Sequence, residues 1–128
     1  MVYPVWVFDP SDWLRFIQLR LFESEWSDMA LKDDALRALE ITIMAGPTLH
    51  PVVPGTRGLR KLRFAEPGSH RGKSGSYRIG YAYFPDYHTV LLVTVWGKNE
   101  KADLVKADRN AIAAVIGEVQ ELLDAGEI

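Results

Sequence analysis

The sequence contains no cysteine and only three histidines. The lack of cysteine excludes disulfide bonds, zinc–thiolate centres and thiol nucleophiles. His50, His70 and His88 are separated by whole predicted elements, and no two of them have the spacing of a metal site. We therefore expect no metal ion and no other cofactor.

Long apolar runs are missing as well. No stretch approaches the roughly 20 apolar residues that a membrane-spanning helix needs. The first six residues lack the basic segment and the long apolar segment of a secretory signal. At 128 residues the chain is long enough for one hydrophobic core and too short for two. We expect a single cytoplasmic domain over residues 1–128, without a membrane partner.

The chain also has no overall excess of basic residues, since its formal net charge is -2. Nucleic-acid affinity comes from Lys and Arg, so this total alone argues against a nucleic-acid partner. The distribution of charge along the chain leads to a different expectation, because between positions 57 and 78 only Glu66 is acidic. The basic residues of this segment are Arg57, Arg60, Lys61, Arg63, Arg71, Lys73 and Arg78. A local cationic surface attracts a polyanion even on an acidic protein; the alternative is an ordinary solvated surface with salt bridges.

The amino-terminal part of the chain predicts one strand and two helices. Residues 2–8 mix β-branched and aromatic side chains, and Pro4 is typical of an edge strand. Apolar residues at helical spacing over 13–21 predict a first helix, and a second apolar stripe over 28–45 predicts another. We expect these two helices to form a hairpin.

The remaining elements follow from residue 59 onward. Residues 59–64 and 77–84 predict two strands, and the unbroken apolar run within 90–96 predicts a third strand, buried on both faces at the centre of the sheet. A full apolar stripe from Ala107 onward predicts a closing helix. The expected order is βααβββα. The sequence thus predicts an α+β fold, with a small antiparallel-rich sheet covered by helices on one face.

Strand alternation brings basic side chains together. Over residues 59–64 it places Lys61 and Arg63 on the face of the sheet that the helices are expected to leave open. Arg78 begins the next strand and Lys98 follows the central one, so all four cations can converge there. Ordinary surface exposure is the alternative for each of them.

The connection between the predicted strands 59–64 and 77–84 has more than one possible role. Arg71–Ser76 has the composition of a phosphate-binding loop, and equally that of a flexible hairpin connection. His70 is either a proton-transfer group or an exposed loop residue. The tyrosines of the following strand either stack on bases or pack within the protein, and packing is favoured. They are Tyr77, Tyr81 and Tyr83.

Three stretches share their pattern with a known family: Pro54–Ala65, Gly72–Ile79 and Trp96–Leu104. Together they resemble the RelE/HigB toxins of type II toxin–antitoxin systems, most closely the HigB-like branch of the RelE/ParE superfamily. The resemblance covers about residues 54–116. It implies a RelE-like fold and metal-independent endonucleolytic cleavage of messenger RNA in the ribosomal A site. It further implies inhibition of translation and neutralisation by a cognate antitoxin.

The resemblance also implies roles for individual residues. It places the catalytic cations at Lys61, Arg63, Arg78 and Lys98. The implied RNA-binding residues are Arg57, Arg60, Arg71 and Lys73. Two features depart from the family pattern: the overall acidity of the chain, and Val105 at a position where relatives often have a Ser or Thr that caps the last helix.

Metal-free RNA cleavage needs a base for the 2′-hydroxyl, charge stabilisation at the phosphate and an acid for the leaving oxygen. Like charges disfavour the ammonium form of a lysine, so we expect Lys61 to act as the base while Arg63 and Arg78 clamp the phosphate. Lys98 or His70 is the expected acid. The alternatives are a non-catalytic RNA-binding module and an antitoxin-binding module of the same fold.

Overall fold

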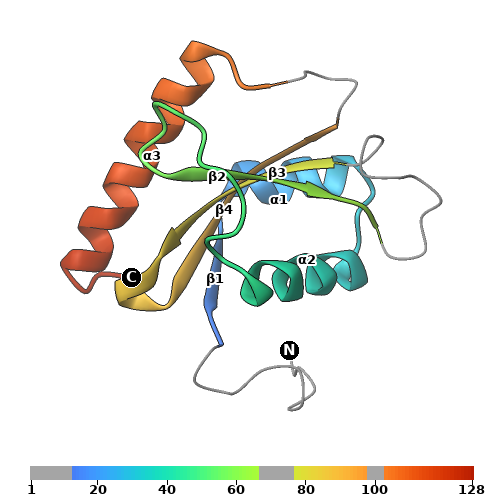
Figure 1. The fold of residues 1–128 in the computed structure, drawn as a ribbon, viewed down its shortest axis with the longest axis horizontal. Helices are drawn as coiled ribbons and strands as arrows, with labels where there is room; N and C mark the ends of the chain where they lie inside the picture. Colours follow the sequence, from blue (N-terminus) through green and yellow to red (C-terminus); the bar gives the residue numbers. More distant parts are fainter. Residues whose placement is uncertain (1–12, 67–76, 98–102) are drawn as a thin grey trace.

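The computed structural model describes residues 13–66, 77–97 and 103–128 (Figure 1). Over these residues the chain has an α+β fold with a four-stranded mixed sheet. No helix in these three ranges is both long enough and apolar enough to span a membrane. In chain order the elements are β1 (Arg15–Gln18), α1 (Arg20–Asp28), α2 (Asp33–Ala45), β2 (Leu59–Phe64), β3 (Tyr77–Phe84), the short 3-10 helix η3 (Pro85–Tyr87), β4 (Thr89–Gly97) and α3 (Lys106–Asp124).

The sheet has the strand order β1-β4-β3-β2. The three strands β2, β3 and β4 pair antiparallel, whereas β1 pairs parallel with β4. The prediction of a buried central strand over 90–96 is confirmed, because β4 lies between two neighbours and every residue from Thr89 to Trp96 is buried. The antiparallel-rich character of the sheet is confirmed as well.

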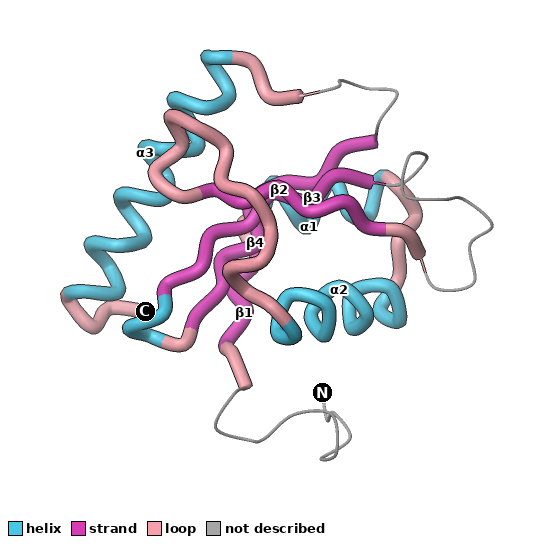
Figure 2. The backbone as a smooth tube through the Cα atoms, in the orientation of Figure 1, coloured by secondary structure: helices cyan, strands magenta, loops and turns pink. Residues whose placement is uncertain are grey.

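The helices cover both faces of the sheet, so the prediction of helices on one face is wrong (Figure 2). On one face, Leu92 of β4 packs in a core with Leu39 of α2. On the other face, Leu91 packs in a second core with Ile116 of α3. The physical reason is the apolar run of β4 itself, since a strand that is apolar on both sides must be covered on both sides.

The amino-terminal elements differ from the prediction. The expected helix over 13–21 is wrong, because β1 occupies Arg15–Gln18 and α1 begins only at Arg20. The backbone N–H of Arg15 donates to the carbonyl of His88, and that of Leu19 donates to the carbonyl of Leu92. Pairing with β4 therefore determines the conformation of this segment, although the spacing of its apolar residues would also suit a helix. The strand expected over 2–8 lies outside the described residues.

The first helix also closes one edge of the sheet. Because β1 ends at Gln18, the later residues of β4 have no strand beside them on that side in the described chain. The carboxylate of Glu25 in α1 accepts hydrogen bonds there from Thr94 Oγ1 (2.6 Å) and from the backbone N–H of Val95 (3.2 Å). The Glu25 side chain thus satisfies the backbone N–H of Val95, which would otherwise need a neighbouring strand.

At the opposite edge, residues 51–53 run beside the first half of β2. The N–H of Val53 donates to the carbonyl of Leu59 (2.8 Å), and the N–H of Lys61 donates to the carbonyl of Pro51 (2.9 Å). Among the described residues, this edge pairing ends at Lys61, in the middle of β2.

Candidate nucleic-acid interface

Three of the predicted catalytic cations lie together on the sheet. Arg63 of β2 and Arg78 of β3 are direct cross-strand partners, and Lys61 precedes Arg63 by two residues on the same face. Directly opposed residues have their Cβ atoms only about 5 Å apart, and like charges in that arrangement are destabilising. We call Lys61, Arg63 and Arg78 the cationic cluster. Three cations on one face of the sheet suit a bound anion.

The cationic cluster lies on the α3 face of the sheet, not on an uncovered face as expected. Leu59 of β2 and Trp96 of β4 belong to the core beneath α3, and alternation puts the cluster on their side. Cover decreases along β2: Leu59 is fully buried, the Lys61 side chain is 29% exposed, and Arg63 is exposed. The cluster therefore lies where the cover of α3 ends.

Arg78 differs from its two neighbours in burial, with only 7% of its surface exposed. Its position between Arg63 on β2 and Trp96 on β4 makes it the inner member of the cationic cluster. A guanidinium is charged at every physiological pH, even in such a place. Arg78 thus supplies a fixed positive charge at a buried position, whereas the side chains of Lys61 and Arg63 reach solvent.

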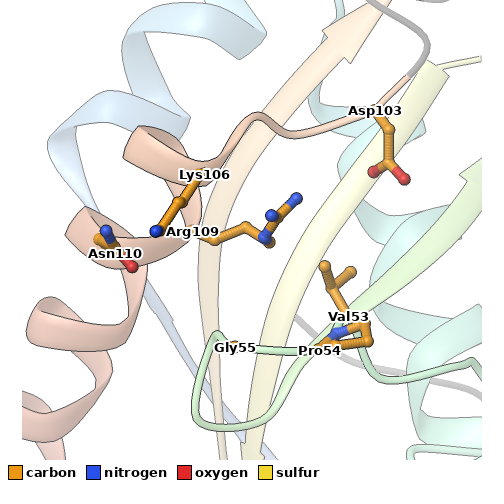
Figure 3. A pocket seen from close by; sticks show the side chains of 7 residues that line it. All are labelled: Val53, Pro54, Gly55, Asp103, Lys106, Arg109 and Asn110. Atoms are coloured by element: carbon orange, nitrogen blue, oxygen red, sulfur yellow. The ribbon is translucent and has the colours of Figure 1, made fainter.

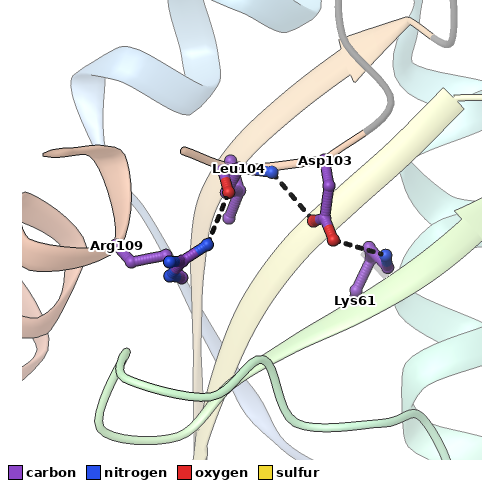
Figure 4. A network of polar contacts seen from close by, with 4 residues as sticks. All are labelled: Lys61, Asp103, Leu104 and Arg109. Atoms are coloured by element: carbon purple, nitrogen blue, oxygen red, sulfur yellow. Dashed lines mark hydrogen bonds and ion pairs between the residues drawn. The ribbon is translucent and has the colours of Figure 1, made fainter. Parts of the chain in front are cut away.

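Asp103, which sequence reasoning missed, pairs with Lys61 (Figure 4). Its Oδ2 lies 3.5 Å from Lys61 Nζ, and its Oδ1 accepts a hydrogen bond from the N–H of Leu104 (2.8 Å). In turn, Arg109 Nη1 donates to the carbonyl of Leu104 (2.8 Å). Side chains therefore bond both backbone groups of Leu104, in the segment that leads into α3. Lys61 is consequently surrounded by mixed charge, not by like charges alone.

Two clefts adjoin the cationic cluster. The first, about 550 Å³, is lined by His50, Pro51, Lys61, Leu62 and Arg63. The second, about 490 Å³, lies between the loop at Val53–Gly55 and the start of α3 (Figure 3). Its remaining lining residues are Asp103, Lys106, Arg109 and Asn110. The ion pair between Lys61 and Asp103 joins the two clefts, and the second cleft adds two cations that no sequence motif indicated.

The predicted RNA-binding residues Arg57 and Arg60 lie apart from the cationic cluster. Arg57 has a left-handed backbone (φ 62°), and a Cβ at Gly117 of α3 would lie 2.5 Å from its Nη1. Arg60 points to the opposite face of β2, where its Nη1 donates to the carbonyls of Thr48 (3.0 Å) and His50 (2.7 Å). Both guanidinium groups thus contact the protein itself. The other predicted residues, His70, Arg71, Lys73 and Lys98, lie outside the described residues.

The packing interpretation of the tyrosine row is confirmed for Tyr81. Its side chain is fully buried on the α2 face, and its hydroxyl donates to the carbonyl of Pro47 (2.9 Å). Burial raises the pKa of Tyr81 to about 12, although the positive charge of Arg60 acts in the opposite direction. A phenol in this position is not available to stack on a base.

Within the described ranges, no group of three histidine or acidic side chains lies close enough to hold a metal ion. The arrangement offers instead a lysine, two arginines and a carboxylate beside two open clefts. By their chemistry, such groups are able to bind a phosphate and to transfer protons. A comparison with models of known protein families gives no match for this sequence.

Proposed function

We propose that this protein is a RelE/HigB-like toxin and a metal-independent endoribonuclease that cuts messenger RNA in the ribosomal A site. The proposed partners are the ribosome with its messenger RNA and a cognate antitoxin. One observation carries the proposal: Lys61, Arg63 and Arg78 share a sheet face beside a cleft of about 550 Å³. The motifs that resemble RelE/HigB toxins include all three residues.

In this proposal the two arginines hold the scissile phosphate. Arg63 is exposed and reaches the non-bridging oxygens, and Arg78 adds positive charge from the inner side. Charge develops on these oxygens as the fifth bond to phosphorus forms, so fixed cations stabilise the transition state more than the ground state. Arg63 is thus a catalytic residue, and Arg78 supports it.

The ion pair suggests proton-transfer roles different from those the sequence favours. Asp103 is beside Lys61, and a carboxylate is a better proton acceptor than a paired ammonium group. The 2′-hydroxyl proton passes to Asp103 while the 2′ oxygen bonds to phosphorus. The bond from phosphorus to the 5′ oxygen then breaks, and Lys61 gives that oxygen a proton. The products are a 2′,3′-cyclic phosphate and a free 5′-hydroxyl, and a proton moving from Asp103 to Lys61 restores both groups.

The test is expression of matched variants in cells that lack the antitoxin. Arg63→Ala removes an exposed cation from the cationic cluster, and Arg37→Ala removes one from α2, where its side chain is 54% exposed. We expect growth arrest and new messenger RNA 5′ ends in codon register for the wild type and Arg37→Ala, and neither for Arg63→Ala. An Arg63→Ala variant that still cuts would refute the proposed site.

The rival candidate is a non-catalytic RNA- or antitoxin-binding module of the same fold. The specific observation in its favour is that Lys61 already has a counter-ion in Asp103, as in a surface built only to bind. The same experiment separates the two. A wild-type protein that expresses well, binds ribosomes and produces no new 5′ ends would favour the binding module.

A further inference from the structure

The segment that leads into α3 is held by side chains from the start of that helix. The N–H of Val105 donates to Oδ2 of Asp108 (3.2 Å). The carbonyl of Leu104 accepts a hydrogen bond from Nη1 of Arg109 (2.8 Å), as Figure 4 shows. Both contacts run backward along the chain, from α3 to the residues just before it. The position of Leu104 therefore depends on the first residues of α3.

Arg109 bonds two successive carbonyls of this segment. Its backbone N–H donates to the carbonyl of Val105 (3.0 Å), and its guanidinium donates to that of Leu104. Leu104 is only 4% exposed, and a buried carbonyl that loses its hydrogen bond is destabilised. Removal of the guanidinium should therefore favour a shift of Leu104 toward water.

Leu104 in turn orients the carboxylate of Asp103. Its N–H donates to Oδ1 of Asp103 (2.8 Å), while Oδ2 lies 3.5 Å from Nζ of Lys61. The Asp103 side chain is 56% exposed, so packing does little to fix it. Three consecutive contacts thus link Arg109 to Lys61 through Leu104 and Asp103.

Arg109 also lines the second cleft, together with Lys106 and Asn110 (Figure 3). A guanidinium has five N–H donors, so direct contact with an RNA phosphate is the alternative role. The two roles differ in what a substitution changes. A lost phosphate contact weakens RNA binding, whereas a misplaced proton acceptor slows the cleavage of RNA that is already bound.

We propose that Arg109 is a positioning residue of the candidate site, which holds the Asp103 carboxylate beside Lys61 by fixing Leu104 between them. The catalytic consequence rests on the proposed nuclease function, in which Asp103 takes the 2′ proton. The structural part does not, because it depends only on the contacts of Arg109 and Leu104.

Hydrogen exchange, followed by NMR on the full chain, measures the structural part. We expect the N–H of Leu104 to exchange at least about fivefold faster in Arg109→Met, the effect of losing one hydrogen bond. The N–H of Ile116, farther along α3, should exchange as in the wild type. Lys106→Met removes a cation from the same cleft and should leave the exchange of Leu104 unchanged. Unchanged exchange at Leu104 in Arg109→Met, or equal acceleration at Ile116, would overturn the proposal.

Kinetics on programmed ribosomes measure the catalytic consequence. Arg109→Met should lower kcat by at least about tenfold and leave KM within about twofold of the wild type. Arg109→Lys keeps the charge and a donor, so its kcat and its exchange rate at Leu104 should lie between those of the wild type and Arg109→Met. A raised KM with an unchanged kcat would overturn the proposal and make Arg109 an RNA contact.

A double variant tests whether Arg109 acts through Asp103. In Asp103→Asn the carboxylate is already lost, so the addition of Arg109→Met should lower kcat by less than about a further twofold. Losses that multiply in the double variant would show that Arg109 acts independently of Asp103, and would overturn the proposed link.

The two proposals fail separately in these experiments. A wild-type protein that does not cut RNA on ribosomes would remove the nuclease, while hydrogen exchange would still decide whether Arg109 fixes Leu104. A wild-type protein that cuts RNA, with the same exchange at Leu104 in Arg109→Met, would retain the nuclease and remove the positioning role.

Discussion

Asp103 is the single residue whose replacement best tests the proposed chemistry. Asp103→Asn keeps the side-chain oxygen that accepts the N–H of Leu104 but removes the negative charge beside Lys61. If the carboxylate takes the 2′ proton, cleavage on programmed ribosomes should fall by about 100-fold or more. Because the pair is partly exposed, the free energy of unfolding should change by less than about 1 kcal/mol.

The matched control for this change is Asp34→Asn, which removes an exposed carboxylate from α2. Across the neutral pH range, Asp34→Asn should have the same single-turnover cleavage rates as the wild type. A wild-type rate in Asp103→Asn itself would exclude Asp103 from proton transfer and return the role of base to another group.

Tyr81 gives the protein a defined response to alkali. Its pKa is about 12 in the folded protein and 10.0 ordinarily, because burial disfavours the phenolate. A raised folded-state pKa contributes stability that is complete below about pH 10 and is lost as the pH rises toward 12. The free energy of unfolding of the wild type should therefore decline over this interval.

Tyr81→Phe provides the comparison for that decline. At neutral pH it loses the hydrogen bond to Pro47 and should be less stable by about 1 kcal/mol. Between pH 10 and 12 it should lack the decline due to residue 81, so the difference between the two proteins should shrink. Denaturant titrations at several alkaline pH values measure this. Parallel curves would contradict the assigned cause.

The site was only partly predictable at the residue scale. Lys61 and Arg63 were placed on one face because strand alternation is a local rule, and Arg78 was expected beside them because it begins the next strand. Asp103 follows no such rule, since nothing local links it to a lysine 42 positions earlier (103 − 61). Lys106 and Arg109 were missed for the same reason: the cleft that they line exists only once α3 lies beside the loop at Val53–Gly55.

Among the elements, β2, β3 and β4 pack closely around position 80, where the residue is a glycine. A Cβ there would lie 3.1 Å from Thr94 Cγ2 and 3.2 Å from Leu59 Cδ2. Gly80→Ala should therefore destabilise the protein by about 1–3 kcal/mol, as overpacked sites do. Denaturant unfolding measures the loss.

A second substitution checks that steric cause. Thr94→Ser removes the methyl group that Gly80→Ala would meet, and it keeps the hydroxyl that bonds Glu25. The double variant should recover part of the stability lost in Gly80→Ala. Strictly additive losses in the two variants would contradict the steric explanation.

The elements that were predicted well are those whose pattern of apolar and polar residues fits only one type of secondary structure. Alternation over 59–64 and 77–84 gave β2 and β3 with their observed bounds. The segment over 13–21 was misread because its apolar residues fit a helical stripe, and the edge of β4 that orders β1 lies far away in the sequence. Cover on both faces was also foreseeable, since the apolar run of β4 requires it.

At the scale of the whole molecule, a net charge of -2 does not reveal the local cluster of basic side chains at Lys61, Arg63 and Arg78. RNA affinity should fall as salt rises, because each phosphate contact releases counter-ions. Arg63→Gln should reduce the slope of log affinity against log salt by about 1. Arg37→Ala, equal in charge change but on α2, should leave the slope unchanged. Fluorescence titrations with a short RNA measure both, and equal slopes for the two variants would contradict a local surface.

The pairing of β1 with β4 joins distant parts of the chain, with Arg15 Nε donating to Thr89 Oγ1 across 74 residues. During synthesis, β1 must therefore wait for most of the protein to emerge before it finds its neighbour. Until then Phe22 and Leu39 have no β4 to pack against. Pairings this distant in sequence slow folding, so we expect the β1–β4 pairing to form late. A nascent chain that stops before Thr89 leaves these apolar helices exposed to chaperones and proteases.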